Sequence, residues 1–248
     1  EECGVIGVFA PNEDVARMTF FGLHALQHRG QEAAGMAVAD GRSMSLHKAV
    51  GLVSQVFTPS MMAEMQGHYA IGHTRYSTTG STSLRNAQPY LVETIYGPLG
   101  IGHNGNLTNA EELKEELFQT DRRHINTRSD SEVLLNVLAH ELAGENVLKL
   151  NAENVFNAVS RVHKRARGAY AVVAMISGFG LLAFRDPFGI RPAVFGSRET
   201  EAGTEFMVAL YFHFMKHNPG FNMDGKGEDL FFLSNGHISP AWYATLAR

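Results

Sequence analysis

Short apolar stretches punctuated by glycine predict β-strands at both ends of the chain. The first stretch, from Cys3 to Ala10, is rich in β-branched residues and is closed by Pro11, so Cys3 should lie at the leading edge of a buried strand. The same pattern predicts further strands at residues 35–40, 44–49, 69–76, 99–103, 169–176, 180–184, 193–196 and 205–209.

Apolar positions at helical spacing predict four helices between these strands. They are expected to begin at Asn12, Asn109, Ser129 and Asn151, and to end near Gly30, Phe118, Leu142 and Gly168. Runs of strands interleaved with runs of helices favour an α+β fold with sheets packed face to face and helices outside. This order is compatible with a four-layer αββα sandwich.

Length and charge narrow the classes of partner. The 248 residues suffice for one large domain, or for one domain plus a fragment. The net charge is −4 and the basic residues are scattered, so we expect a small-molecule partner, no nucleic acid and no membrane. Without a long apolar run or a signal-peptide pattern, the sequence predicts a cytoplasmic protein.

Cysteine and histidine usage limits the chemistry. The single cysteine, Cys3, excludes an intrachain disulfide and a cysteine-ligated zinc or iron–sulfur site within this chain. The 12 histidines form no recognised metal-ligand motif, so no metal site is predicted. A lone cysteine is commonly a buried thiol, and other segments must decide whether Cys3 reacts.

Two of these segments follow predicted strands. Arg75, at a strand end, could hold a carboxylate through paired hydrogen bonds or could form a surface ion pair. In the polar segment 103–107, the Asn104 amide and the Gly105 backbone N–H could stabilise an oxyanion. Asn-Gly is also a common hairpin turn, so the segment by itself favours a turn.

Two further segments lie at helix ends. Ser129 and Glu132 fit a capping box, which would leave Asp130 to bind an ammonium group or to complement the helix dipole. Arg29 could pair with carbonyls at the end of the first helix. Gly30 would allow a left-handed turn that brings the following backbone near Cys3.

Together these segments, in this order and spacing, resemble class II glutamine amidotransferases, which are N-terminal nucleophile hydrolases. The sequences of residues 26–32 (LQHRGQE) and 185–192 (RDPFGIRP) are most similar to those of the amidophosphoribosyltransferases, and the match runs from Cys3 to about Ala209. The resemblance implies an αββα fold in which mature Cys3 is the first residue and attacks the side-chain amide of glutamine.

The same resemblance assigns roles to the other residues. It implies that Arg75 binds the α-carboxylate of glutamine, that Asp130 binds its α-ammonium, and that Asn104 and Gly105 form the oxyanion hole. Arg29, Gly30 and Thr78 would complete the substrate pocket. In the full-length family the released ammonia crosses to a second, Mg-dependent phosphoribosyltransferase domain, where it displaces pyrophosphate from phosphoribosyl pyrophosphate in purine synthesis.

Residues 1–2 and 210–248 depart from this pattern. While Glu1 and Glu2 precede Cys3, the nitrogen of Cys3 is an amide without useful basicity, so we expect a leftover propeptide whose removal activates the protein. Segments 210–219 and 229–237 resemble an N-terminal piece of transketolase, in which His237 would lie near thiamine diphosphate. About 40 residues are too few for that cofactor site, and no cofactor is expected within this chain.

Three functions therefore stay open. The leading one is a glutaminase whose ammonia-accepting domain is absent from the sequence, with homo-oligomerisation possible. The second is an N-terminal-cysteine hydrolase of another amide, whose pocket should not need both Arg75 and Asp130. The third is a catalytically silent, chimeric fragment.

Overall fold

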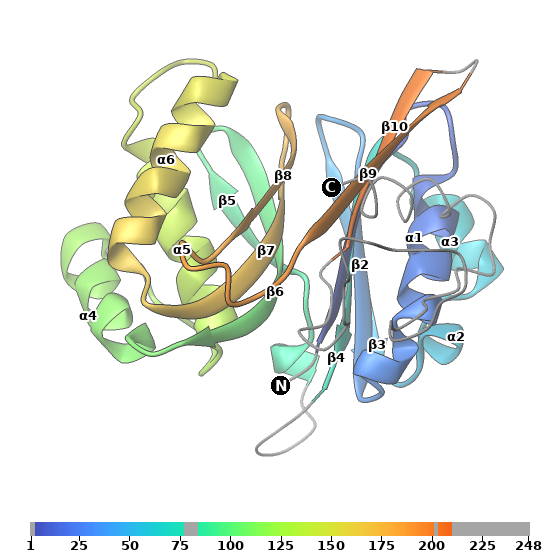
Figure 1. The fold of residues 1–248 in the computed structure, drawn as a ribbon, viewed down its shortest axis with the longest axis horizontal. Coiled ribbons are helices and arrows are strands. Elements are labelled where there is room, and N and C mark those ends of the chain that lie inside the picture. The colour runs from blue at the N-terminus through green and yellow to red at the C-terminus, as the bar shows by residue number, and fades with distance from the viewer. Residues whose placement is uncertain (1–2, 77–83, 201–202, 210–248) are drawn as a thin grey trace, which may run out of the picture.

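The computed structural model describes residues 3–76, 84–200 and 203–209. Two antiparallel sheets face each other, and helices cover the outer face of each sheet (Figure 1). The predictions for residues 1–2, for Thr78 and for the segment 210–248 lie outside the described residues.

The larger sheet has six strands in the order β3-β2-β4-β1-β10-β9. Their bounds are β1 Gly4–Phe9, β2 Ala33–Ala39, β3 Met44–Val50, β4 Tyr69–Arg75, β9 Val194–Thr200 and β10 Gly203–Ala209. In the β1–β4 pair, Gly4 lies opposite Thr74. Cys3 precedes Gly4 and Arg75 follows Thr74, so in this antiparallel pair Cys3 and Arg75 lie together at one end of the strands.

The smaller sheet has four strands in the order β5-β6-β7-β8. Their bounds are β5 Tyr90–Thr94, β6 Gly97–Leu107, β7 Gly168–Ile176 and β8 Gly180–Arg185. β7 is almost entirely buried, since it packs against helices on one face and the larger sheet on the other. β5 was not predicted from the sequence.

Helices form the two outer layers. The larger sheet carries α1 Val15–Ala25, the 3₁₀ turn η1 Gln27–Arg29, α2 Val53–Val56 and α3 Pro59–Glu64, and the smaller carries α4 Ala110–Asp121, α5 Asp130–Ala143 and α6 Ala152–Arg165 (Figure 1). A second 3₁₀ turn, η2, spans Leu84–Asn86. α2 and α3 were not predicted from the sequence, because they are only 4 and 6 residues long and carry little periodicity.

Small residues let the two sheets approach closely. A Cβ added at Gly7 would lie 2.5 Å from Cγ1 of Val173, and one at Gly102 would lie 2.7 Å from Cγ1 of Val5. The layer between the sheets is built from seven buried side chains: Val5, Ala37, Ala39, Ile71, Ala171, Val173 and Met175. This packing fixes β6 of one sheet against β1 and β4 of the other.

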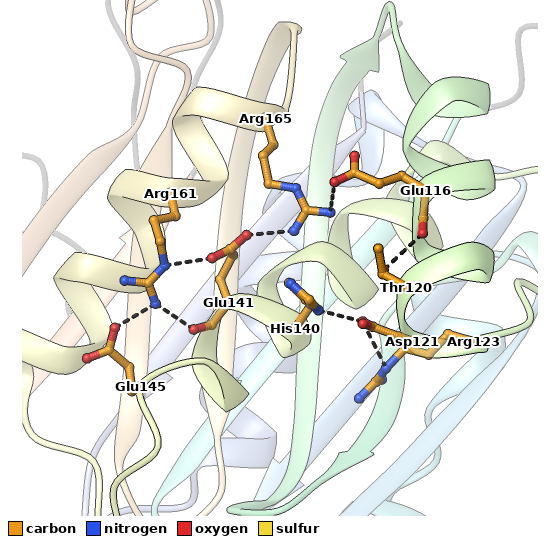
Figure 2. Close-up of polar contacts among 9 residues, drawn as sticks. All are labelled: Glu116, Thr120, Asp121, Arg123, His140, Glu141, Glu145, Arg161 and Arg165. Carbon is orange, nitrogen blue, oxygen red and sulfur yellow. Dashed lines mark hydrogen bonds and ion pairs between the residues drawn. The ribbon is translucent and has the colours of Figure 1, made fainter.

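An ion-pair cluster joins the three helices over the smaller sheet (Figure 2). The carboxylate of Glu141 on α5 accepts from Arg161 Nε and Arg165 Nη1 on α6, both at 2.6 Å. Arg161 also contacts Glu145 at 2.6 Å, and Arg165 contacts Glu116 on α4 at 3.1 Å. The side chain of Glu141 is only 8% exposed, so these partners offset the cost of burying a carboxylate.

Two local predictions about helix ends were wrong. Asp14, not Asn12, caps α1, because its carboxylate accepts from the backbone N–H of Arg17. Ser129 does cap α5, but Glu132 does not complete a capping box. Its carboxylate instead accepts from the backbone N–H groups of Asn126 and Thr127 at 2.9 and 2.7 Å, which orders the loop before the helix.

Candidate active site

The end of α1 and the turn η1 surround Cys3. Cys3 is half-buried at the start of β1. Arg29 is 2% exposed and its Nε donates to the carbonyl oxygen of Cys3 at 3.0 Å. The guanidinium thus reaches across 26 residues of sequence to the candidate nucleophile, rather than only pairing with the end of its own helix.

Gly30 lets the turn η1 pack against the end of β4, although not through a left-handed turn. Its backbone is extended, with φ −161° and ψ 122°, so the predicted turn was wrong. A Cβ at this position would lie 2.6 Å from the carbonyl carbons of Thr74 and Arg75. Glycine is therefore required by close approach of two backbone segments, which draws Arg29, Gly30 and Arg75 together around Cys3.

Arg75 has an acidic partner that the sequence analysis missed. Its Nη1 donates to Glu32 Oε1 at 2.9 Å, and the two side chains are 16% and 13% exposed. The backbone N–H of Glu32 also donates to the carbonyl oxygen of Arg75 at 3.2 Å. The pair holds the guanidinium in place at the edge of the sheet, and a substrate carboxylate there would have to share it with Glu32.

Asn104 and Gly105 lie within β6, so the prediction of a turn at this segment was wrong. The strand continues to Leu107, and Gly105 pairs with Tyr170 of β7. Gly105 has φ +152°, and a Cβ there would lie 2.1 Å from the carbonyl oxygen of Ala169. Long-range pairing with β7 overrides the local turn signal and requires glycine at this position.

The direction of β6 carries Asn104 toward Cys3 and Arg75. A Cβ at Gly100 would lie 3.3 Å from Ile71, and His73 Nε2 lies 3.2 Å from the carbonyl oxygen of His103. β6 therefore runs beside β4 in the same direction, toward the edge where Arg75 ends that strand. Asn104 is 2% exposed, and its Oδ1 has no hydrogen-bond partner among the described residues.

Asp130 is anchored to the same strand. Its Oδ2 accepts from the backbone N–H of Leu107 at 2.9 Å, and its Oδ1 lies 4.0 Å from Nδ1 of His103. The side chain is 21% exposed at the first turn of α5. The carboxylate is thus fixed relative to Asn104 and Gly105 instead of being unattached, as the capping-box interpretation had implied.

Burial controls the charge of His73, which lies beneath this edge. The side chain is completely buried, and desolvation lowers its pKa to about 3, despite the hydrogen bond to the His103 carbonyl oxygen, which raises it. The imidazole is therefore neutral near pH 7, and its Nε2–H donates to that carbonyl oxygen.

We expect His73 to make folding pH-dependent. The unfolded chain takes up a proton near pH 6.5 and the folded chain only near 3, so stability is complete above about pH 6.5 and falls toward pH 3. This one group contributes a slope of up to about 1.4 kcal/mol per pH unit. His73→Asn should reduce the slope by about that amount, measured by urea unfolding from pH 7 to 4. An unchanged slope would show that His73 accepts a proton in the folded protein.

One cavity lies away from these residues. It has a volume of about 640 Å³ and opens between the edge strands β8 and β9. Apolar side chains such as Phe9, Leu181 and Phe195 line it, and none of the predicted site residues does. Over the described ranges, no group of three His, Cys, Asp or Glu side chains could hold a metal ion.

No helix within the described residues combines the length and apolar character needed to cross a membrane.

Comparisons with known proteins find a glutamine amidotransferase domain over residues 73–211. Amidophosphoribosyltransferase of Pseudomonas aeruginosa is 50% identical over 207 residues, which cover 84% of this chain and 41% of that protein. The Escherichia coli (strain K12) amidophosphoribosyltransferase is also 50% identical, over 209 residues, with the same coverage of 84% and 41%.

Solved structures give the same result. Glutamine phosphoribosylpyrophosphate amidotransferase from B. subtilis, complexed with ADP and GMP, matches with a TM-score of 0.68 and 33% identity, over 84% of this chain and 41% of that one. This chain therefore spans about two fifths of the length of these relatives. The family resemblance stated from the sequence is confirmed: the chain belongs to the glutamine amidotransferase domain family.

Proposed function

We propose that this chain hydrolyses glutamine to glutamate and ammonia, with Cys3 as the nucleophile. The observation that carries the proposal is the meeting of four kinds of group at one edge of the two facing sheets. These are a half-buried thiol, an arginine at the end of β4, an amide next to a glycine N–H on β6, and a carboxylate on α5. Membership of the amidotransferase family supports the assignment.

The chemistry follows from a free amino group on Cys3. An α-amine with a pKa near 8 takes the thiol proton, and the sulfur attacks the carbonyl carbon of the glutamine side-chain amide. The Asn104 amide and the Gly105 N–H stabilise the oxyanion. The protonated amine then gives its proton to the leaving nitrogen, ammonia departs, and a thioester remains. Water attacks the thioester, and glutamate and the thiol are released.

Recognition of glutamine falls to the two charged residues. Arg75 binds the α-carboxylate with the guanidinium N–H groups that Glu32 does not use. Asp130 binds the α-ammonium, while the backbone N–H of Leu107 donates to one oxygen of the Asp130 carboxylate. Arg29 and Gly30 form the wall beside the nucleophile, and Thr78 contributes a hydroxyl. The fold that supports this site is inferred to be the four-layer αββα sandwich of N-terminal nucleophile hydrolases.

The relatives suggest what receives the ammonia. They are amidophosphoribosyltransferases more than twice as long as the matched region. We infer that residues 3–209 are their glutaminase domain, and that in the longer proteins a Mg-dependent phosphoribosyltransferase domain uses the ammonia in purine synthesis. Residues 210–248 are inferred to be a transketolase-like fragment that does not bind thiamine diphosphate.

The sharpest test of the proposal compares glutamate release from glutamine by two samples, one beginning at Glu1 and one trimmed to begin at Cys3. We expect activity only in the trimmed sample, because only there does Cys3 carry a basic amine. Trimmed protein with Cys3→Ser is the matched control and should be inactive. Equal activity in both samples would show that the α-amine is not the base.

The trimmed sample also separates glutamine from other amides. Arg75→Ala and Asp130→Ala should each abolish glutamine hydrolysis if they bind its α-carboxylate and α-ammonium. If both variants kept the parent protein's activity toward glutamine, the hydrolase of other specificity would be favoured, because its pocket should not need both residues. Absence of activity and of labelling by a glutamine-like diazo-ketone would indicate the silent fragment.

A further inference from the structure

A buried network of polar side chains connects the two groups that would bind opposite ends of glutamine. Its members are Gln88 in the loop before β5, His103 on β6 and Ser131 on α5, which are 6%, 2% and 2% exposed. His103 directly precedes Asn104, and Ser131 directly follows Asp130. The network therefore lies immediately behind the candidate oxyanion donor and the candidate ammonium-binding carboxylate.

Gln88 binds both backbone groups of His103. Its Oε1 accepts from the His103 N–H at 2.8 Å, and its Nε2 donates to the His103 carbonyl oxygen at 3.2 Å. Because a backbone N–H can only donate, this contact fixes which end of the amide is oxygen and which is nitrogen. Nε2 must then also be the donor to Ser131 Oγ, at 3.1 Å.

This assignment directs the proton of Ser131. A hydroxyl has one hydrogen, and Ser131 Oγ already accepts from Gln88. Its remaining neighbour in the network is Nδ1 of His103, at 2.8 Å. If Ser131 Oγ accepted from Nδ1–H as well, its own hydrogen would have no acceptor in this buried network. We therefore assign the hydroxyl as the donor to Nδ1, which places the proton of a neutral imidazole on Nε2.

The consequence concerns Asp130, whose Oδ1 lies 4.0 Å from the same Nδ1. If Nδ1 carried a proton, His103 would compete with an ammonium group for that carboxylate. With Ser131 donating to Nδ1, no such pair forms and the negative charge of Asp130 faces the substrate. Another titratable group in contact with His103 is His73 on β4, and the charges of Arg75 and Lys48 act on His73.

We propose that Gln88, His103 and Ser131 are positioning residues for the glutaminase reaction: Gln88 fixes the part of β6 that carries Asn104, and Ser131 keeps His103 from pairing with Asp130. The proposal rests on the proposed function. The two roles should have different kinetic effects. A change at Gln88 that disturbs β6 should affect stabilisation of the oxyanion, whereas a change at Ser131 that lets His103 pair with Asp130 should affect binding of glutamine.

Kinetics of the trimmed protein test this division. Ser131→Ala should raise KM for glutamine about three- to tenfold with kcat nearly unchanged, since a hydrogen bond of ordinary strength is lost. The rise should be greatest at low pH, where His103 takes up a proton facing Asp130, and should shrink as pH increases. Gln88→Leu should instead lower kcat more than it raises KM. Ser177→Ala, at a serine 7% exposed that lies after β7, is the matched control and should change neither constant.

A second measurement does not depend on activity. In ¹⁵N-histidine spectra at pH 7, the His103 signal, identified by its loss in His103→Gln, should show an unprotonated Nδ1 and a protonated Nε2. In Ser131→Ala, Nδ1 of His103 should become protonated at a higher pH than in the parent protein, because the hydroxyl that donates to it is gone. A protonated Nδ1 in the parent, or a KM effect of Ser131→Ala that does not vary with pH, would overturn the proposal. If the trimmed parent protein had no glutaminase activity but showed the expected spectrum, the proposed function would be overturned, and only the hydrogen-bond network would be supported.

Discussion

Replacing Asn104 with alanine in the trimmed protein is expected to lower kcat for glutamine hydrolysis about 100- to 1000-fold while the protein stays folded. The loss is that of one hydrogen-bond donor to the oxyanion, and an effect of this size is typical when such a donor is removed. KM should change little, because the oxyanion exists only in the transition state and the intermediate. The measurement is steady-state glutamate release together with an unfolding curve.

The structure explains why the fold should tolerate this change. Asn104 is 2% exposed, but its Oδ1 has no hydrogen-bond partner among the described residues, so the truncation removes no contact that this oxygen makes to them. Its backbone pairing with Ala171 of β7 does not depend on the side chain. A buried amide oxygen without a partner is costly for stability, and this cost is more typical of a binding site than of a position kept for the fold.

Asn106 provides the matched control. It lies two residues further along β6, on the same strand, and is exposed. Asn106→Ala should keep kcat within about twofold of the parent, since a surface substitution seldom changes a site that it does not touch. Equal losses of kcat in the two variants would mean that the strand, and not the Asn104 amide, is what the reaction needs.

Local sequence signals predicted most strands and helices that hold the site. The run from Cys3 to Ala10 was predicted as a strand because it is apolar, β-branched and closed by Pro11, and β1 spans Gly4–Phe9. Ser129 was predicted to begin a helix and caps α5, because a serine before an apolar helical run can accept from the first turn. Each of these signals lies within a few residues of the element it determines.

The errors arose where distant residues decide the structure. Asn104 and Gly105 have the composition of a turn, but nine residue pairs between β6 and β7 extend the strand through them. Glu32 meets Arg75 across 43 residues, and Gln88 meets Ser131 across the same separation. A glutamate after Gln31, or a glutamine before a proline, has no local feature that marks such a partner. Only the packing of the two sheets brings these residues to the site.

The helix layer that presents Asp130 should depend strongly on Glu141, at the other end of α5. Glu141→Ala is expected to lower the free energy of unfolding by about 3 kcal/mol, because it leaves Arg161 and Arg165 without the carboxylate that lies between them (Figure 2). The loss should fall at the low end of the range for buried pairs, since Arg161 is 37% exposed and keeps Glu145. Urea unfolding measures it.

Glu116 on α4 provides the control that distinguishes loss of the buried Glu141 carboxylate from loss of an exposed ion pair. It contacts Arg165 at 3.1 Å, but its side chain is 49% exposed, so Glu116→Ala should cost less than about 1 kcal/mol. The difference follows from solvent: water can replace Glu116 around Arg165, whereas at Glu141 the 8% exposed carboxylate lies between α5 and α6, where little water reaches. Equal losses in the two variants would show that the position of Glu141 between the helices adds nothing. A larger loss for Glu141→Ala, with kcat unchanged in the folded protein, would show that this cluster stabilises α5 without taking part in the chemistry at its first turn.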